Sequence, residues 1–269
     1  MNSLNWKSKE LVNVAELDDY YWHRGYFHAS FDKTGLYKRD FDELLSRDLS
    51  MFTLFPIEGK RVIDIGCGNG LYLLTFLKMG AGFVAGQDLS PKFINDSRAA
   101  CEKNGYTNVD LKVGDCQQLQ FDDASFDVAF SGDVFEHITR ELKVNFINEV
   151  YRVLKPGGVF TIKTPNKDYL IASNALRRIK TALQFKNPFN VHIAHTKNNP
   201  DNEHHGLTTY REMKEIFEQT MFHQPVITYY GLAKNGVTRF LSRLFPKSRY
   251  LNPHIIITVR KPVFFGLYK

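Results

Sequence analysis

The feature that most constrains this chain is a strand-like apolar run that ends in a glycine-rich loop. Residues 61–65 are followed by glycines at positions 66, 68 and 70, where an amphipathic helical pattern begins. Glycines allow a tight turn and a close approach to a ligand, and the N–H groups of the helix start point into the same site. Many nucleotide binders have such a loop, and a purely structural turn also needs glycine. The loop alone therefore does not identify the ligand, and other residues of the chain must be considered with it.

Apolar runs of strand length alternate with amphipathic runs of helix length after this loop, up to residue 163. This pattern predicts βαβ units and an α/β fold with a parallel sheet covered on both faces. The expected strands are 61–65, 83–87, 109–113, 127–131 and 158–163, and the expected helices are about 70–79, 91–104 and 139–154. Lys155-Pro156-Gly157-Gly158 should stop the last of these helices, because proline cannot continue one.

The 269 residues are expected to form one domain, since single α/β domains reach this size. Its expected parts are a helical N-terminal cap (1–58), a binding core (59–165), an insertion (166–224) and C-terminal strands (225–269). The insertion would hold a basic helix at 168–184, a histidine-bearing loop at 192–206 and a helix at 209–221. Strands at about 225–230 and 254–260 would complete the sheet.

The composition predicts a soluble, cytoplasmic protein, with peripheral membrane contact left open. Residues 1–17 lack the apolar core of a signal peptide, and no run approaches the roughly 18 apolar residues of a membrane span. Cys67, Cys101 and Cys116 show no CxxC spacing and are typical of reduced thiols. The net charge of +6 permits anionic partners but identifies none.

Three aspartates accompany the expected strand ends. Asp64 lies two residues before the first glycine, where a carboxylate would suit a cationic amino group and repel a diphosphate. Asp88 follows Gly70 by 18 residues and ends the second strand, where it can hold ribose hydroxyls, although a helix N-cap is the alternative interpretation. Asp115 ends the third strand and is placed to accept a hydrogen bond from an adenine amino group.

These segments, taken in order, resemble the class I methyltransferases that depend on S-adenosylmethionine (SAM), with a layout similar to ubiquinone-biosynthesis O-methyltransferases. The resemblance extends over about 100 residues and rests on Val62–Gly70, Gly86–Ser90, Gly114-Asp115, Ser125–Val128 and Leu154–Gly158. It implies a Rossmann-like, mostly parallel sheet of seven strands whose last strand is antiparallel. It also implies that SAM is the cofactor and S-adenosylhomocysteine the product.

The resemblance assigns the cofactor site by position. Gly66, Cys67, Gly68 and Gly70 would line the methionine moiety beside Asp64. The ribose would lie against Asp88 and Leu89, and adenine against Asp115 and Cys116. Tyr21 and Arg24 belong to an aromatic N-terminal segment that would fold over the site, with an aromatic face against the sulfonium and Arg24 on a carboxylate, although core packing is the alternative for the aromatics.

Two competing functions follow from the same motifs. An NAD-dependent oxidoreductase shares a glycine loop and a later acidic residue, but the GxGxG spacing and Asp64 favour SAM. A catalytically inert SAM-binding module that acts as a regulator or partner is the second alternative. The filled recognition region argues against it, and detectable methyl transfer would exclude it.

The catalytic candidates are Asp133, His137 and His205. Asp133 and His137 follow the fourth strand, in a segment that resembles the one beneath the methyl group in this family, although Glu136 and His137 would alternatively cap the next helix. His205 is preferred among the loop histidines 192, 195, 204 and 205 as a general base. Their spacing matches no strong zinc pattern, so no metal is expected.

The acceptor is expected to be a small molecule, or a lipid- or glycan-linked one, methylated at oxygen. Gly132-Asp133-Val134-Phe135 lacks the Asn/Asp-Pro-Pro-aromatic segment of enzymes that methylate base amines, so nucleic acid is disfavoured. Residues 168–184 and 239–247 combine basic and apolar residues, which favours contact with a membrane surface. A cover helix that buries its apolar face on the protein's own core is the alternative for 168–184. The oligomeric state is not indicated.

Overall fold

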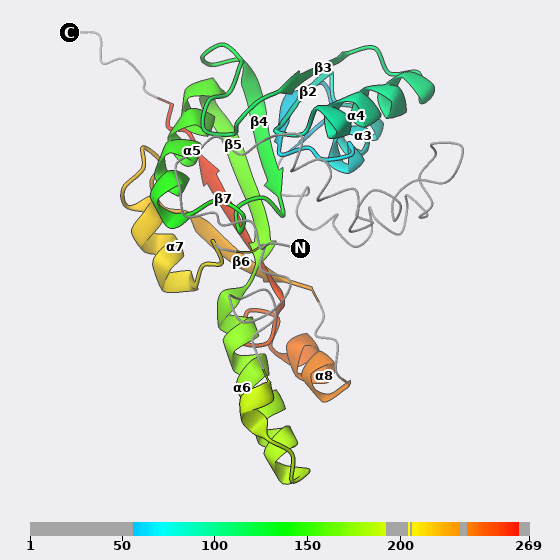
Figure 1. Ribbon diagram of the computed structural model, residues 1–269. Coiled ribbons are helices and arrows are strands. Elements are labelled where there is room, and N and C mark those ends of the chain that lie inside the picture. Colours follow the sequence, from blue (N-terminus) through cyan, green and yellow to red (C-terminus); the bar gives the residue numbers. More distant parts are fainter. Residues whose placement is uncertain (1–55, 192–203, 205, 232–235, 264–269) are drawn as a thin grey trace, which may run out of the picture.

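The computed structural model describes residues 56–191, 204, 206–231 and 236–263, which build one mixed sheet flanked by helices (Figure 1). Most of the expected N-terminal cap, with Tyr21 and Arg24, lies outside these residues, as does His205. The strands are β1 (Arg61–Ile65), β2 (Phe83–Asp88), β3 (Val109–Val113), β4 (Phe126–Gly132), β5 (Leu154–Pro165), β6 (Val226–Tyr230) and β7 (His254–Arg260). The helices are α3 (Leu71–Lys78), α4 (Pro91–Lys103), α5 (Arg140–Val153), α6 (Lys167–Leu183), η1 (Pro188–Asn190), α7 (Tyr210–Phe217) and α8 (Gly236–Leu244).

The sheet has the strand order β3-β2-β1-β4-β5-β7-β6. β1 pairs in parallel with β2 and β4, β2 with β3, and β4 with β5, whereas β7 runs antiparallel to β5 and β6. The predicted Rossmann-like sheet of seven strands with an antiparallel last strand is therefore confirmed. Because the chain crosses from β3 back to β4 beside β1, the strand order reverses there, and in open α/β sheets ligands bind at such a switch point.

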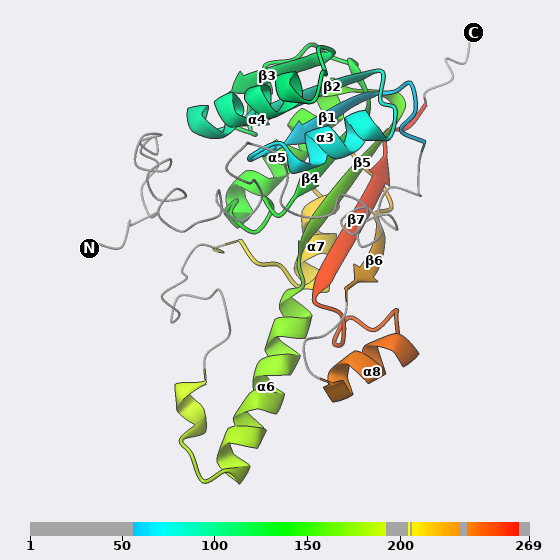
Figure 2. The ribbon, with the colours of Figure 1, turned by 90° about the vertical axis from the view of Figure 1, so that its right-hand side faces the viewer.

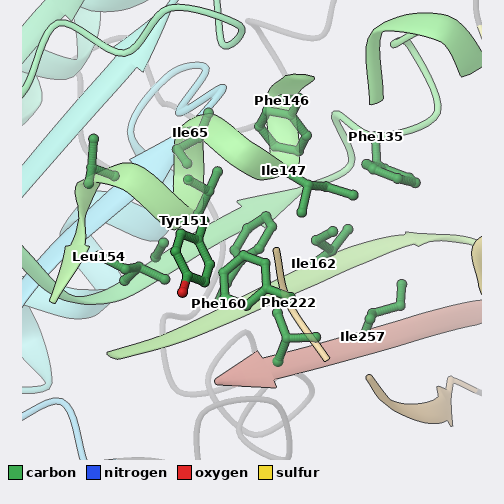
Figure 3. Packing of buried hydrophobic residues seen from close by; sticks show 14 of the residues in the cluster. Ile65, Phe135, Phe146, Ile147, Tyr151, Leu154, Phe160, Ile162, Phe222 and Ile257 are labelled. Carbon is green, nitrogen blue, oxygen red and sulfur yellow. The ribbon is translucent and has the colours of Figure 1, made fainter. Parts of the chain in front are cut away.

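The core consists of an apolar layer on each face of the sheet. α3 and α4 cover one layer. α5 and α7 cover the other, where Phe146, Phe160 and Phe222 pack together (Figure 3). Phe146 and Phe160 are fully buried, so truncation of either to alanine would cost about 3–5 kcal/mol. This packing fixes the strand ends that carry the site.

Two predicted boundaries differ from the structure. β5 begins at Leu154 and not at 158, because Leu154 already pairs with Phe126 of β4. The two glycines at 157 and 158 therefore lie inside the strand. α7 ends at Phe217 rather than at 221, since Gln219 and Thr220 donate backbone hydrogen bonds to Ile216 and Phe217, which closes the last turn.

Helix α6 projects away from the end of the sheet, with α8 at the same end of the molecule (Figures 1 and 2). It begins where Asn166 accepts hydrogen bonds from the N–H groups of Asp168 and Tyr169. Its apolar residues Leu176 and Ile179 are 54% and 58% exposed. The cover-helix interpretation therefore does not fit the part of the chain that the structure describes. None of the described helices is long and apolar enough to cross a membrane.

Candidate cofactor and acceptor site

The glycine loop between β1 and α3 has the backbone that only glycine adopts easily. Gly66, Gly68 and Gly70 have φ values of +72°, +51° and +84°. A Cβ on Gly66 would overlap the side chain of Val134, and one on Gly70 would lie 2.9 Å from Oγ of Ser97. No described side chain caps α3, so the N–H groups of its first turn face the loop. The loop is thus closely backed by protein on two sides.

Asp64 is a buried carboxylate directly before this loop. Asp64 is only 1% exposed, and neither of its carboxylate oxygens has a hydrogen-bond partner among the described residues. Burial raises the pKa of Asp64 well above its ordinary value, and the nearby negative charge of Asp88 raises it further. An unpaired buried carboxylate is unfavourable. A cationic ligand group, such as the ammonium of an amino acid, would fit here.

Asp88 connects the loop with the end of β2. Its Oδ2 accepts a hydrogen bond of 2.9 Å from the N–H of Gly68, and its Oδ1 accepts one of 3.0 Å from the N–H of Ser90. Ser90, not Asp88, is the N-cap of α4, since its Oγ accepts from the N–H of Phe93. These two contacts fix the carboxylate between the glycine loop and the start of α4. Leu89 beside it is 36% exposed.

Asp115 and Cys116 follow β3 at the same sheet edge. Oδ1 of Asp115 accepts a hydrogen bond of 2.9 Å from the N–H of Gln117. Cys116 is half-buried against the core, and burial raises the pKa of its thiol, with Asp115 adding to the effect. The thiol is therefore protonated at neutral pH and offers a small apolar surface beside the loop.

Gln87 is a positioning residue that the sequence motifs did not indicate. It is 1% exposed, and its Nε2 donates to the carbonyl oxygens of Asp115 and Gln118 at 2.7 and 3.1 Å. The backbone carbonyl of Gln87 accepts a hydrogen bond of 2.7 Å from the N–H of Gly66. Gln87 thus holds the glycine loop and the loop after β3 in one arrangement. A polar residue in an otherwise apolar buried strand was the available signal.

Asp133 is held by a buried lysine that sequence reasoning also missed. Its φ is +57°, and its Oδ2 lies 2.5 Å from Nζ of Lys163, a residue 5% exposed on β5. Nζ of Lys163 also donates to the hydroxyl of Tyr72 at 3.2 Å. The carboxylate is therefore paired with a buried ammonium group, and this contact fixes the orientation in which it would meet a polar acceptor.

His137 meets His204 rather than a helix terminus. The N-cap of α5 is Thr139, so the alternative in which Glu136 and His137 cap that helix does not fit. The rings of His137 and His204 are 4.8 Å apart between centroids, edge to face. The structure thereby brings a residue of the loop after η1 to the end of β4.

A buried lysine joins these two segments. Lys143 is fully buried, and its Nζ donates to the carbonyl oxygens of Phe135 and Gly206, the latter at 2.7 Å. The N–H of Gly206 donates in turn to the carbonyl of Glu136 at 2.7 Å. Burial lowers the pKa of Lys143 to about 7, with the charge of Glu136 opposing that effect. Burial likewise raises the pKa of Glu136 to about 8.

Residues 57–221 match the family model described as a methyltransferase domain. This chain belongs to that methyltransferase family. A probable S-adenosylmethionine-dependent methyltransferase of Mycolicibacterium smegmatis is 36% identical over 109 residues, which are 40% of this chain and 39% of the relative. A ubiquinone biosynthesis O-methyltransferase of Cereibacter sphaeroides is 34% identical over 122 residues, 45% of this chain and 47% of the relative. The matches thus span less than half of either relative.

Solved structures agree on the fold. A SAM-dependent methyltransferase from Mesorhizobium loti superimposes with a TM-score of 0.58 at 18% identity, covering 82% of this chain and 100% of the other. The predicted resemblance to class I SAM-dependent methyltransferases and the predicted cofactor are therefore confirmed. The buried Asp64 and the closely backed glycine loop fit this cofactor, whose methionine part carries an ammonium group.

Proposed function

We propose that this chain transfers the methyl group of SAM to an oxygen of a small or lipid-linked acceptor. Asp64 carries the proposal, because it is a buried carboxylate without a described partner beside the glycine loop. The amino group of SAM would neutralise it. Asp88 would hold the ribose, while Gln87 positions the loop that carries Asp115 and Cys116 near adenine.

Bound SAM supplies an electrophilic methyl carbon, so the protein's main work is to align the acceptor and exclude water. Val134 packs on Gly66, which places the segment after β4 directly over the glycine loop. Asp133, fixed by Lys163, would accept a hydrogen bond from a hydroxyl of the acceptor and orient it. His137 would remove the hydroxyl proton as the new bond forms.

Oxygen as the target draws support from the ubiquinone biosynthesis O-methyltransferases among the relatives, which match 45% and 42% of this chain. The test uses methyl-labelled SAM with the full chain and two acceptor pools, one of hydroxylated quinones and phenols and one of lysine peptides. Label in the first pool is expected. Label only in peptides would overturn the oxygen assignment, and SAM binding without transfer to any acceptor in a metabolite extract would support an inert binding module instead.

Helices α6 and α8 support an acceptor that resides in a membrane. Both helices expose large apolar side chains, and Leu183, Phe240 and Leu244 are 76%, 62% and 56% exposed. Exposed cations lie among them, and no acidic residue occurs between Asp168 and Asn190. Apolar residues beside cations match an anionic lipid surface. α6 follows directly from β5, whose end lies at the same sheet edge as the site, so a lipid-linked acceptor bound there would be within reach.

Sedimentation with vesicles tests this surface. The full chain should sediment with phosphatidylserine vesicles at low salt, and less with phosphatidylcholine alone, because the cations contribute about 1 kcal/mol each near an anionic surface. No sedimentation with either vesicle would refute membrane contact and leave the SAM site untouched.

A further inference from the structure

The end of β4 and the loop before α7 bring together three side chains of the kind that bind metal ions. Glu136, His137 and His204 each offer one ligand atom, and these three atoms all lie within 4.8 Å of one another. Ligand atoms around a zinc-sized ion lie about 3–4 Å apart, given bonds of about 2.0–2.2 Å. The three atoms therefore lie close to the spacing that such an ion requires.

We propose that Glu136, His137 and His204 bind a divalent first-row transition-metal ion beside the cofactor loop. Two imidazoles and one carboxylate favour zinc, iron or manganese over magnesium, which prefers an all-oxygen shell. Three protein ligands leave at least one coordination position open. The spacing gave no reason to expect this site, since 67 positions separate His137 from His204.

The carboxylate is oriented by a neighbour in the manner of metal ligands. Oε2 of Glu136 accepts a hydrogen bond of 2.8 Å from Oγ1 of Thr164, and both residues are 1% exposed. Such outer contacts hold a ligand in its binding rotamer. Thr164 lies on β5, so the sheet itself positions the carboxylate.

The two segments are also joined through the backbone. Lys143 donates to the carbonyl oxygens of Phe135 and Gly206, and the N–H of Gly206 donates to the carbonyl of Glu136. The carbonyl of Phe135 lies one residue before Glu136, and Gly206 lies two residues after His204. The contacts of Lys143 therefore hold both chain segments that carry the cluster. The cluster is thus held by built structure rather than by a chance approach of surface loops. The Nζ of Lys143 donates to these backbone carbonyls and not to the Glu136 carboxyl group.

The site also lies next to the reacting region. Val134, which packs on Gly66, precedes Glu136 by two residues. With the ion bound, His137 would serve as a ligand and no longer as the base; an acceptor hydroxyl in the open coordination position would then lose its proton to solvent more easily, because the ion stabilises the anion. Its oxygen would then bond to the methyl carbon while the carbon–sulfur bond breaks and its electron pair stays on sulfur. This role rests on the proposed function, whereas metal binding does not.

Metal binding is measured on the full chain after removal of metals with a chelator. Calorimetry with Zn²⁺ and paramagnetic resonance with Mn²⁺ should each show one ion per chain. His204→Ala and Glu136→Gln should each weaken binding more than about tenfold, since loss of even outer-shell contacts costs that much. His223→Ala is the matched control, because His223 is exposed and lies outside the cluster. It should leave the affinity unchanged.

Glu136→Gln retains the size of the side chain and its acceptor for Thr164, which keeps the test meaningful if His204→Ala fails to fold. SAM titrations of the same variants separate the two claims. Metal binding that disappears while SAM binding persists supports the site. Absence of 1:1 binding for both ions up to about 1 mM, or equal affinity in wild type, His204→Ala and Glu136→Gln, would overturn it, whether or not SAM binds.

Discussion

Gly206→Ala probes the junction that joins the end of β4 to the loop before α7. The added Cβ would overlap the carbonyl oxygen of Ile138 and lie 2.7 Å from Nζ of Lys143 and 3.0 Å from the carbonyl oxygen of Glu136. Since two of these three atoms belong to backbone, the segment around position 206 must move away. The hydrogen bonds that Gly206 makes with Glu136 and Lys143, both 2.7 Å, would then be lost or lengthened.

The magnitude follows from those two bonds. A neutral hydrogen bond contributes about 0.5–1.5 kcal/mol and one to a charged group about 1.5–3 kcal/mol, so the free energy of unfolding should fall by about 2–4.5 kcal/mol. Urea unfolding at neutral pH measures it. Gly105→Ala is the control, because its Cβ meets open space and only its φ of +77° is strained, at about 1–2 kcal/mol.

A Gly206→Ala protein with a free energy of unfolding within about 0.5 kcal/mol of wild type would refute the argument that this junction is close-packed. So would an effect no larger than that of Gly105→Ala.

Three further predictions address other parts of the molecule. Lys143 has a lower pKa in the folded chain (about 7) than in the unfolded one, so the unfolded state binds more protons above pH 7. This lysine should therefore make the free energy of unfolding rise with pH toward 10, by up to about 1.4 kcal/mol per pH unit. Lys143→Met should remove this rise in urea unfolding, and an unchanged slope would contradict the prediction. Gln87→Leu removes the donor to two carbonyls of the loop after β3, so SAM affinity by calorimetry should fall about tenfold, and an unchanged affinity would exclude a positioning role. Ile179→Ser should reduce sedimentation with anionic vesicles without changing SAM affinity, whereas His223→Ala should alter neither; equal sedimentation would remove α6 from the membrane surface.

The sheet was predictable because its strands are defined by local periodicity. Runs such as Val62–Ile65, which is apolar except for Asp64, are buried on both faces, so they can be recognised without knowledge of their neighbours. The start of β5 could not be predicted, because the pairing of Leu154 with Phe126 depends on a partner strand and not on the residues of β5 itself. The antiparallel β7 followed from family resemblance alone.

The site residues divide along the same line. Asp64 and Asp88 were identifiable because each occupies a fixed position relative to a strand end and the glycines. Lys143 and Lys163 were not, since each becomes informative only when folding buries its charge against distant backbone or an aspartate. The sequence pattern favoured His205 in its loop. The neighbouring His204 lies against His137, and the contacts between Lys143 and Gly206 hold that segment.

The central claim is that the buried carboxylate of Asp64 binds the amino group of SAM, and ligand selectivity tests it most directly. Affinities for S-adenosylhomocysteine and for methylthioadenosine, which lacks the amino-acid part, are measured in wild type, Asp64→Asn and the exposed control Asp122→Asn. Wild type and control should prefer S-adenosylhomocysteine, and Asp64→Asn should reduce that preference about ten- to hundredfold, since a hydrogen bond to a charged group contributes about 1.5–3 kcal/mol. An undiminished preference in Asp64→Asn would contradict the account.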